Sequence, residues 1–118
     1  MGFAAVESNI VNRIQDPDVQ RFLTEKWDLI EQHFAPEHFI LFGSRINGTP
    51  HEWSDIDMIV VSKAFAETRF IGRAYHFKTI IAPHTATSVL CYTPEEFVSA
   101  STGIGVVPDA CREGIWLK

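Results

Sequence analysis

Four residues of this 118-residue chain have types and spacing suited to metal and phosphate chemistry: Gly43, Ser44, Asp55 and Asp57. The glycine and serine end one apolar run, and after ten further residues the aspartates begin a second. Residues two apart in a strand share a face, so both carboxylates should project side by side. Two adjacent carboxylates repel one another and are costly to bury without a cation. The pair therefore predicts a site for a hard divalent ion such as Mg²⁺.

The Gly43-Ser44 pair offers the complementary chemistry, which is phosphate binding. Glycine lets a ligand approach the backbone, and serine adds a hydroxyl beside main-chain N–H groups. Phosphate oxygens would then complete the shell of an ion held by Asp55 and Asp57. Arg45 could reach a phosphate with its planar guanidinium, and a surface ion pair is an equal alternative. A phosphate-binding turn beside a carboxylate pair indicates nucleotidyl transfer.

Residues 42–61 resemble the polymerase-beta-type nucleotidyltransferases, above all their minimal nucleotidyltransferase (MNT) domains. The stretch holds the Gly-Ser pair, ten residues and Asp-x-Asp without a gap, as in that family. Residues 92–97 and 112–117 add to the likeness, which spans most of the chain. The resemblance implies an α+β fold of the polymerase-beta type. In that fold a small mixed sheet has helices packed mainly on one face.

The resemblance also implies roles for individual residues. Gly43, Ser44 and Arg45 would bind the nucleotide, and Asp55 and Asp57 would be catalytic and hold one or two Mg²⁺ ions. ATP is the implied substrate. Stand-alone MNT proteins commonly pair with a helical HEPN protein as a toxin–antitoxin module and add AMP to a tyrosine of that partner. We therefore expect an antitoxin that uses Mg-ATP to transfer AMP to a HEPN-type protein.

The chain departs from the family at a third carboxylate, which the family carries on a later strand. Counting back from Tyr92 places that position at Ser88, or at Thr87 if the register slips, and residues 84–91 contain no acid. Serine brings no negative charge and is a poor general base. Three interpretations stay open: a slow enzyme, an enzyme whose base comes from elsewhere, or a nucleotide-binding pseudoenzyme. His84 is a candidate substitute base, since imidazole titrates near neutral pH.

The missing acid supports a second class of function, a binding module that neutralises its partner by contact alone. A third idea, an antibiotic-modifying nucleotidyltransferase, usually requires an added domain for the drug. A chain of 118 residues provides that domain only if it dimerises.

Composition predicts one domain over residues 1–118, because 46% of the residues are hydrophobic and can form a core. The net charge is −5 without a Lys/Arg tract, so we expect no autonomous nucleic-acid binding. No apolar run approaches the roughly 20 residues of a membrane span, and no signal-peptide pattern opens the sequence. The two cysteines lack metal-ligand spacing and are expected to be reduced thiols. These features predict a cytoplasmic protein without membrane association.

The elements that must position the site can be outlined from periodicity. Asp16 and Pro17 predict a helix start, as N-cap and first helical residue, and the helical pattern ends before Pro36. Its apolar stripe comprises Val19, Phe22, Leu23, Trp27, Ile30 and Phe34. Thr93 and Glu96 predict a capping box at a later helix start.

Further elements are predicted as strands over residues 37–42, 55–62, 86–92 and 115–117, and helices over residues 63–80 and 108–113. The apolar residues of the 63–80 segment surround more than one face. We therefore expect it to be buried on two sides, against the sheet and against another subunit, which makes a homo-oligomer a possible partner state.

Overall fold

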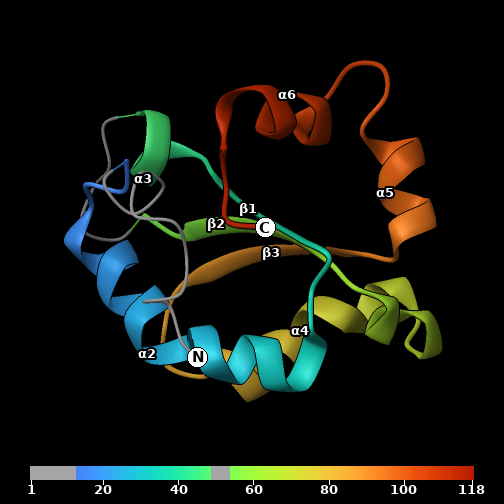
Figure 1. The fold of residues 1–118 in the computed structure, drawn as a ribbon, viewed down its shortest axis with the longest axis horizontal. Coiled ribbons are helices and arrows are strands. Elements are labelled where there is room, and N and C mark those ends of the chain that lie inside the picture. Colours follow the sequence, from blue (N-terminus) through green and yellow to red (C-terminus); the bar gives the residue numbers. More distant parts are fainter. Residues whose placement is uncertain (1–12, 49–53) are drawn as a thin grey trace.

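The fold is described from a computed structural model, in which residues 13–48 and 54–118 are placed. Its centre is a four-stranded sheet of order β3-β2-β1-β4 (Figure 1). The strands are β1 (His38–Phe42), β2 (Ile56–Val61), β3 (Thr87–Tyr92) and β4 (Ile115–Trp116). β2 and β3 are parallel, whereas β1 is antiparallel to both β2 and β4. This mixed sheet confirms the predicted α+β class.

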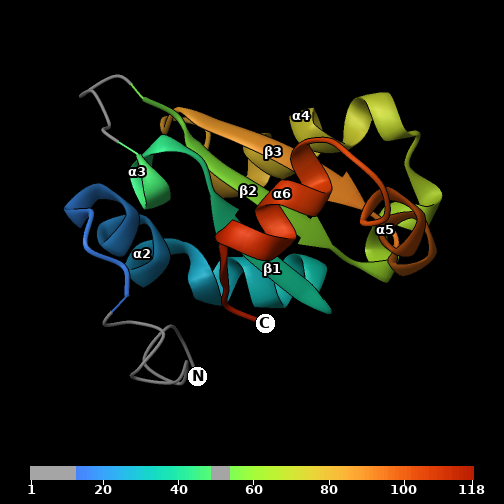
Figure 2. The ribbon, with the colours of Figure 1, turned by 90° about the horizontal axis from the view of Figure 1, so that it is seen from above.

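The helices are divided unequally between the two faces of the sheet (Figures 1 and 2). The longer helices, α2 (Pro17–Phe34) and α4 (Phe70–Ile81), bury the main apolar core against one face. The shorter helices, α5 (Pro94–Ala100) and α6 (Val106–Glu113), cover a smaller cluster on the other. A single-turn helix, α3 (Ser44–Asn47), follows β1. Among the placed residues, no helix has the length and apolarity to cross a membrane.

The start of α2 confirms the capping predicted at Asp16. Its carboxylate accepts hydrogen bonds from the backbone N–H groups of Asp18 and Val19, at 2.8 and 3.2 Å. The helix ends at Phe34, before Pro36, as expected. All six residues of the predicted stripe are buried, so this helix supplies much of the core on its side of the sheet.

The prediction of one continuous helix over residues 63–80 is wrong, because the segment forms two separate helical pieces. A 3₁₀ turn, η2 (Lys63–Glu67), comes first, and Thr68 is extended at φ −116° and ψ 134° before α4 begins. The reason is tertiary: the Phe65 ring is buried 5.4 Å from that of Phe34. Ser62 donates to the Phe34 carbonyl and caps Ala64 N–H at 3.0 Å. These contacts with α2 favour a separate turn.

The remaining elements agree with their predictions to within about two residues. α6 begins at Val106 rather than at residue 108, and β4 spans two residues rather than three. The capping box is present, with Thr93 Oγ1 accepting from Glu96 N–H at 3.3 Å and the Glu96 carboxylate accepting from Thr93 N–H at 2.8 Å. Both cysteines are free thiols.

Candidate active site

The Gly43 backbone and the Asp57 carboxylate lie directly against each other. The antiparallel register of β1 and β2 pairs Phe42 with Asp57, and Gly43 follows at once. Gly43 has φ +85°, and a Cβ added there would lie 2.1 Å from Asp57 Oδ2. Only glycine combines that conformation with so close an approach. The structure therefore brings the Gly-Ser turn and the second aspartate together.

Ser44 opens α3 at the rim of this contact. The Gly43 carbonyl accepts from the N–H groups of Ile46 and Asn47 at 3.0 and 2.9 Å, and the Ser44 carbonyl accepts from Gly48 N–H at 3.0 Å. These bonds close one helical turn around the serine. The chain thus makes a tight bend immediately beside the Asp57 carboxylate.

The two aspartates interact with each other, as adjacent carboxylates should. Asp55 is exposed just before β2, and Asp57 is half-buried within it. Burial raises the pKa of Asp57, and the negative charge of Asp55 raises it further. A bound cation would relieve both effects. The oxygen ligands and the mutual repulsion fit a hard divalent ion, with Asp55 and Asp57 as the residues that would hold it.

Within residues 13–48 and 54–118, no cluster of three or more His, Cys, Asp or Glu side chains could hold a metal ion. The position predicted for the third acid explains this. Parallel pairing of β2 with β3 puts Ser88 beside Asp57, whereas Thr87 pairs with Ile56 and is buried. Of the two registers considered, Ser88 is therefore the one next to the carboxylate pair. The Thr87 hydroxyl is buried without a hydrogen-bond partner among the described residues.

Two hollows flank the contact between Gly43 and Asp57 on the α5–α6 face. The first, of about 570 Å³, has Asp57 and Ser88 in its wall. The second, of about 390 Å³, has Gly43 and Ser44 in its wall, and both share Phe42 and Val106. Each volume falls within the roughly 300–1,000 Å³ of small-molecule sites. We call the two hollows together the cleft.

The apolar wall of the cleft escaped the sequence analysis. It includes Leu90, Tyr92, Ile104 and Val106. The alternation of side chains along β3 could have indicated part of this wall. Residues two apart in a strand share a face, and these are Ser88, Leu90 and Tyr92. The contribution of the loop before α6 had no comparable signal.

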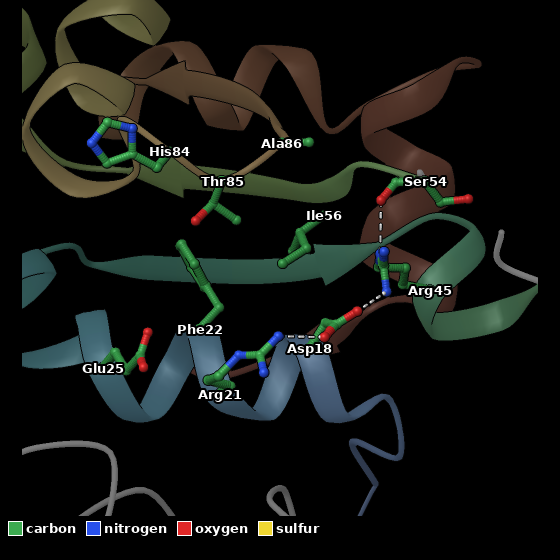
Figure 3. Close-up of a pocket in the computed structure, with 10 residues that line it drawn as sticks. All are labelled: Asp18, Arg21, Phe22, Glu25, Arg45, Ser54, Ile56, His84, Thr85 and Ala86. Atoms are coloured by element: carbon green, nitrogen blue, oxygen red, sulfur yellow. Dashed lines mark hydrogen bonds and ion pairs between the residues drawn. The ribbon is translucent and has the colours of Figure 1, made fainter. Parts of the chain in front are cut away.

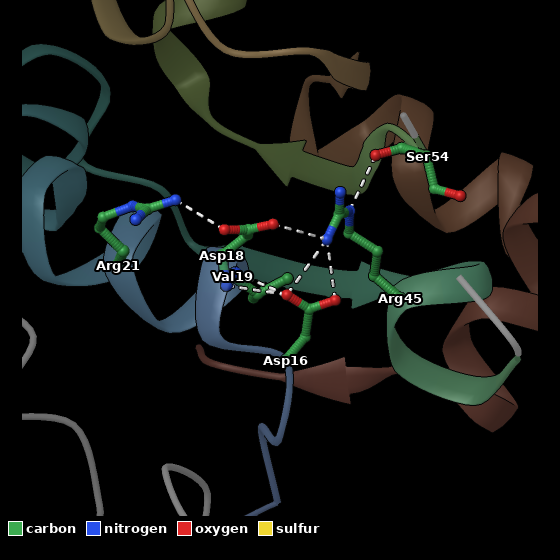
Figure 4. Close-up of polar contacts among 6 residues, drawn as sticks. All are labelled: Asp16, Asp18, Val19, Arg21, Arg45 and Ser54. Atoms are coloured by element: carbon green, nitrogen blue, oxygen red, sulfur yellow. Dashed lines mark hydrogen bonds and ion pairs between the residues drawn. The ribbon is translucent and has the colours of Figure 1, made fainter. Parts of the chain in front are cut away.

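Arg45 is not in the wall of the cleft. Of its two predicted roles, phosphate contact or an ion pair, its side chain forms an ion pair (Figure 4). Its Nη1 lies 2.9 Å from Asp16 Oδ2 and 3.2 Å from Asp18 Oδ2, and its Nε donates to the Ser54 carbonyl at 2.8 Å. The pair is buried rather than superficial, with the Arg45 and Asp16 side chains each 8% exposed.

His84 lines a different hollow, of about 420 Å³, between α2 and the loop before β3 (Figure 3). Ile56, which shares that hollow, and Asp57 point to opposite faces of the sheet because they are consecutive in a strand. The structure therefore does not bring His84 into the cleft.

Comparison with known proteins gives independent information. The profile of the nucleotidyltransferase domain family matches residues 19–97. A crystal structure of a candidate nucleotidyltransferase from Sulfolobus solfataricus superimposes with a TM-score of 0.57 at 21% identity, covering 98% of this chain and 90% of that chain. That likeness supports the fold alone. No curated protein matches the sequence significantly.

Proposed function

The chain belongs to the nucleotidyltransferase domain family, and from that premise we propose that it binds Mg-ATP in the cleft and transfers AMP to a partner protein. The family generally uses a nucleoside triphosphate and a divalent metal ion. We propose that residues 1–118 act as one domain, with a HEPN-type helical protein as the acceptor and the chain as its antitoxin. The partner is proposed from the MNT resemblance, and a cytoplasmic location is proposed from the sequence pattern.

The approach of Gly43 to Asp57 is the observation that carries the proposal. A Cβ at Gly43 would fall 2.1 Å from Asp57 Oδ2, so the backbone at the turn and the carboxylate share one small space. In our proposal Gly43 and Ser44 hold the β- and γ-phosphates, and Asp55 and Asp57 hold the metal ion. When bound, that ion would neutralise triphosphate charge and stabilise the departing pyrophosphate.

The reaction would be an in-line displacement at the α-phosphorus. The acceptor hydroxyl oxygen forms a bond to the α-phosphorus, the bond from that phosphorus to the α–β bridging oxygen breaks, and pyrophosphate leaves. The hydroxyl proton must pass to a base. Ser88 beside Asp57 is a poor one, so we expect slow transfer in which the acceptor or solvent takes the proton.

A second candidate function rests on the same serine. With Ser88 in place of an acid beside Asp57, the chain could bind nucleotide and partner without transferring AMP. It would then act as a binding module that neutralises the partner by contact.

The experiment that separates these functions uses α-³²P-ATP, Mg²⁺ and the purified product of the neighbouring gene. Transfer predicts label on the partner that is lost in Asp57→Asn and increased in Ser88→Asp. If calorimetry shows Mg-ATP binding but neither the wild type nor Ser88→Asp labels the partner, the binding module replaces the enzyme. If Mg-ATP does not bind, the transfer proposal and the nucleotide-binding part of the second are wrong, and only neutralisation by contact is left.

A further inference from the structure

We propose that Arg45 is a positioning residue that holds the Gly43-Ser44 turn and Asp55 in the relative places that the cleft requires. The inference rests on the proposed function of the cleft. Arg45 Nε donates to the Ser54 carbonyl at 2.8 Å, and Nη1 donates to Asp16 Oδ2 at 2.9 Å. One guanidinium therefore joins the start of α2, the turn and the peptide that precedes Asp55 (Figure 4).

The low exposure of the Arg45 guanidinium restricts it to the partners that it has in the structure. The side chains of Arg45 and Asp16 are each 8% exposed, and an ion pair with so little contact with water is costly to break by removing one partner. The planar guanidinium donates to the carboxylate and to the carbonyl in two fixed directions, which a single ammonium group cannot reproduce. Asp16 is itself fixed, because it caps α2.

The turn needs outside support, since an isolated helix of one turn is unstable in water. Among the residues that the structure describes, three contacts tether α3. Arg45 joins it to α2, Ile46 packs against the core on the α2 side, and Asn47 Nδ2 donates to the Glu113 carbonyl at 2.8 Å. Arg45 is the tether next to Ser44, so it sets the orientation of the residue proposed to contact phosphate.

Asp55 is positioned through its neighbours, because its own side chain is exposed. On one side the Ser54 carbonyl is held by Arg45. On the other side Ile56 N–H donates to the Ala86 carbonyl at 3.0 Å. Loss of Arg45 would release one of these two anchors and let the Asp55 carboxylate move away from Asp57.

The decisive variant is Asp16→Asn. Asparagine caps helices as well as aspartate does, so the change keeps the start of α2. It removes the nearer of the two carboxylate charges that face Arg45, and Asp18 stays at 3.2 Å. Loss of a nearby negative charge would by itself strengthen binding of an anionic nucleotide. Positioning predicts the opposite sign: weaker Mg-ATP binding by about 10–100-fold, the range for losing a supporting contact behind a ligand.

Arg45→Lys separates positioning from direct contact with phosphate. It retains the positive charge but cannot span Asp16 and Ser54, so we expect a similar loss of Mg-ATP affinity. The double variant Asp16→Asn/Arg45→Lys should bind no more weakly than the weaker single variant, because both act through one contact. Lys118→Gln is the matched control: Lys118 is exposed, pairs with Glu31 in the last turn of α2 at 3.0 Å, and should leave affinity unchanged.

A second measurement needs no nucleotide. Amide hydrogen exchange in the unliganded protein should be faster at Asn47, Gly48 and Ile56 in Asp16→Asn and Arg45→Lys, and unchanged in Lys118→Gln. Faster exchange with weaker binding supports the inference. Unchanged exchange, or Mg-ATP binding that Asp16→Asn leaves equal or strengthens, overturns it. If the wild type does not bind Mg-ATP, the proposed function is wrong. The exchange measurement then still tests whether Arg45 holds the turn and the Ser54 carbonyl in place.

Discussion

At the scale of single residues, the site combines a turn that requires glycine with a carboxylate whose charged form is disfavoured by folding. Gly43 adopts φ +85°, a conformation that side chains disfavour, and Asp57 is a partly buried carboxylate whose pKa is raised by burial and by Asp55. Perturbed carboxylates concentrate at functional sites. Each feature leads to a prediction about stability that is separate from activity.

Gly43→Ala should destabilise the protein by about 2–3 kcal/mol, from backbone strain and displacement of the Asp57 carboxylate. Gly72→Ala is the control, since the nearest atom to an added Cβ there is the Thr68 methyl at 3.9 Å. In the first turn of α4 that change should stabilise by a few tenths of a kcal/mol, up to about 1 kcal/mol. Urea unfolding of both variants checks the pair, and a Gly43→Ala protein as stable as the wild type would contradict the geometry.

Asp57→Asn should raise the melting temperature at pH 7 while weakening Mg-ATP binding at least about tenfold. The pKa of Asp57 is raised in the fold, so folding favours the protonated form. The stability that this proton confers is present at low pH and is lost as pH rises through the raised pKa. The gain from asparagine should therefore be present at pH 7 and vanish near pH 3.5. Calorimetric melting across that range tests the sign, and a lower melting temperature at pH 7 would refute it.

At the scale of secondary structure, one buried cation joins three elements behind the cleft. Arg73 on α4 donates to the Thr68 carbonyl at 2.8 Å, to the Cys91 carbonyl on β3 at 3.4 Å, and to Glu96 on α5 at 2.5 Å. Its side chain is 6% exposed and that of Glu96 is 41% exposed. This junction holds α4 and α5 on either side of β3, and it also anchors the extended residues between η2 and α4.

Glu96→Gln should reduce the acid sensitivity of the fold. The hydrogen bond from Arg73 lowers the pKa of Glu96, and the Thr93 N–H lowers it further. The stability from the ionised form is thus complete above the ordinary glutamate pKa and is lost as pH falls through the lowered value. We expect the variant to be about 1 kcal/mol less stable at pH 7, since the buried Arg73 loses its carboxylate while the 41% exposure of Glu96 lets solvent screen that charge. The difference should shrink toward pH 3. Glu95→Gln in the same turn is the control, and melting curves from pH 3 to 7 provide the test.

At the scale of the whole molecule, α4 faces the sheet with one side and solvent with the other. Phe70, Ile71 and Tyr75 are 53%, 91% and 77% exposed. The sequence predicted burial of this helix on two sides. In the fold, the side that faces the sheet is buried and the other side is exposed. Contiguous exposed apolar surface of this kind is typical of interaction sites. A second copy of the chain on this surface therefore stays a prediction.

Ile71→Glu should prevent self-association if that prediction is right. An introduced carboxylate would be desolvated in an apolar interface, so the dimer should dissociate at least about tenfold more readily. Val98→Glu changes an exposed apolar residue on α5 and should have no effect. Sedimentation velocity over a hundredfold range of protein concentration distinguishes the outcomes. A wild type that is monomeric throughout would show that the predicted oligomer is wrong.

Much of the fold and the centre of the site could be read from the sequence because local rules set them. Caps at Asp16 and Thr93 and the apolar stripe of α2 defined helices correctly. Strand alternation predicted that Asp55 and Asp57 act on each other. The family resemblance placed the missing acid at Ser88 or Thr87, and the β2–β3 pairing decides for Ser88. These features depend on spacing within a strand or a turn, which the chain encodes over a few residues.

Other features depend on contacts between residues far apart in the chain, and only the tertiary structure decided them. Arg45 turns from the cleft to Asp16, 29 residues earlier, because a buried carboxylate there needs a counter-charge. The helix breaks at Thr68 because Phe65 packs on Phe34. His84 faces the wrong side because the sheet lies between its hollow and the cleft. Spacing determines which residues can share a face, and packing of distant segments determines which side chain meets which.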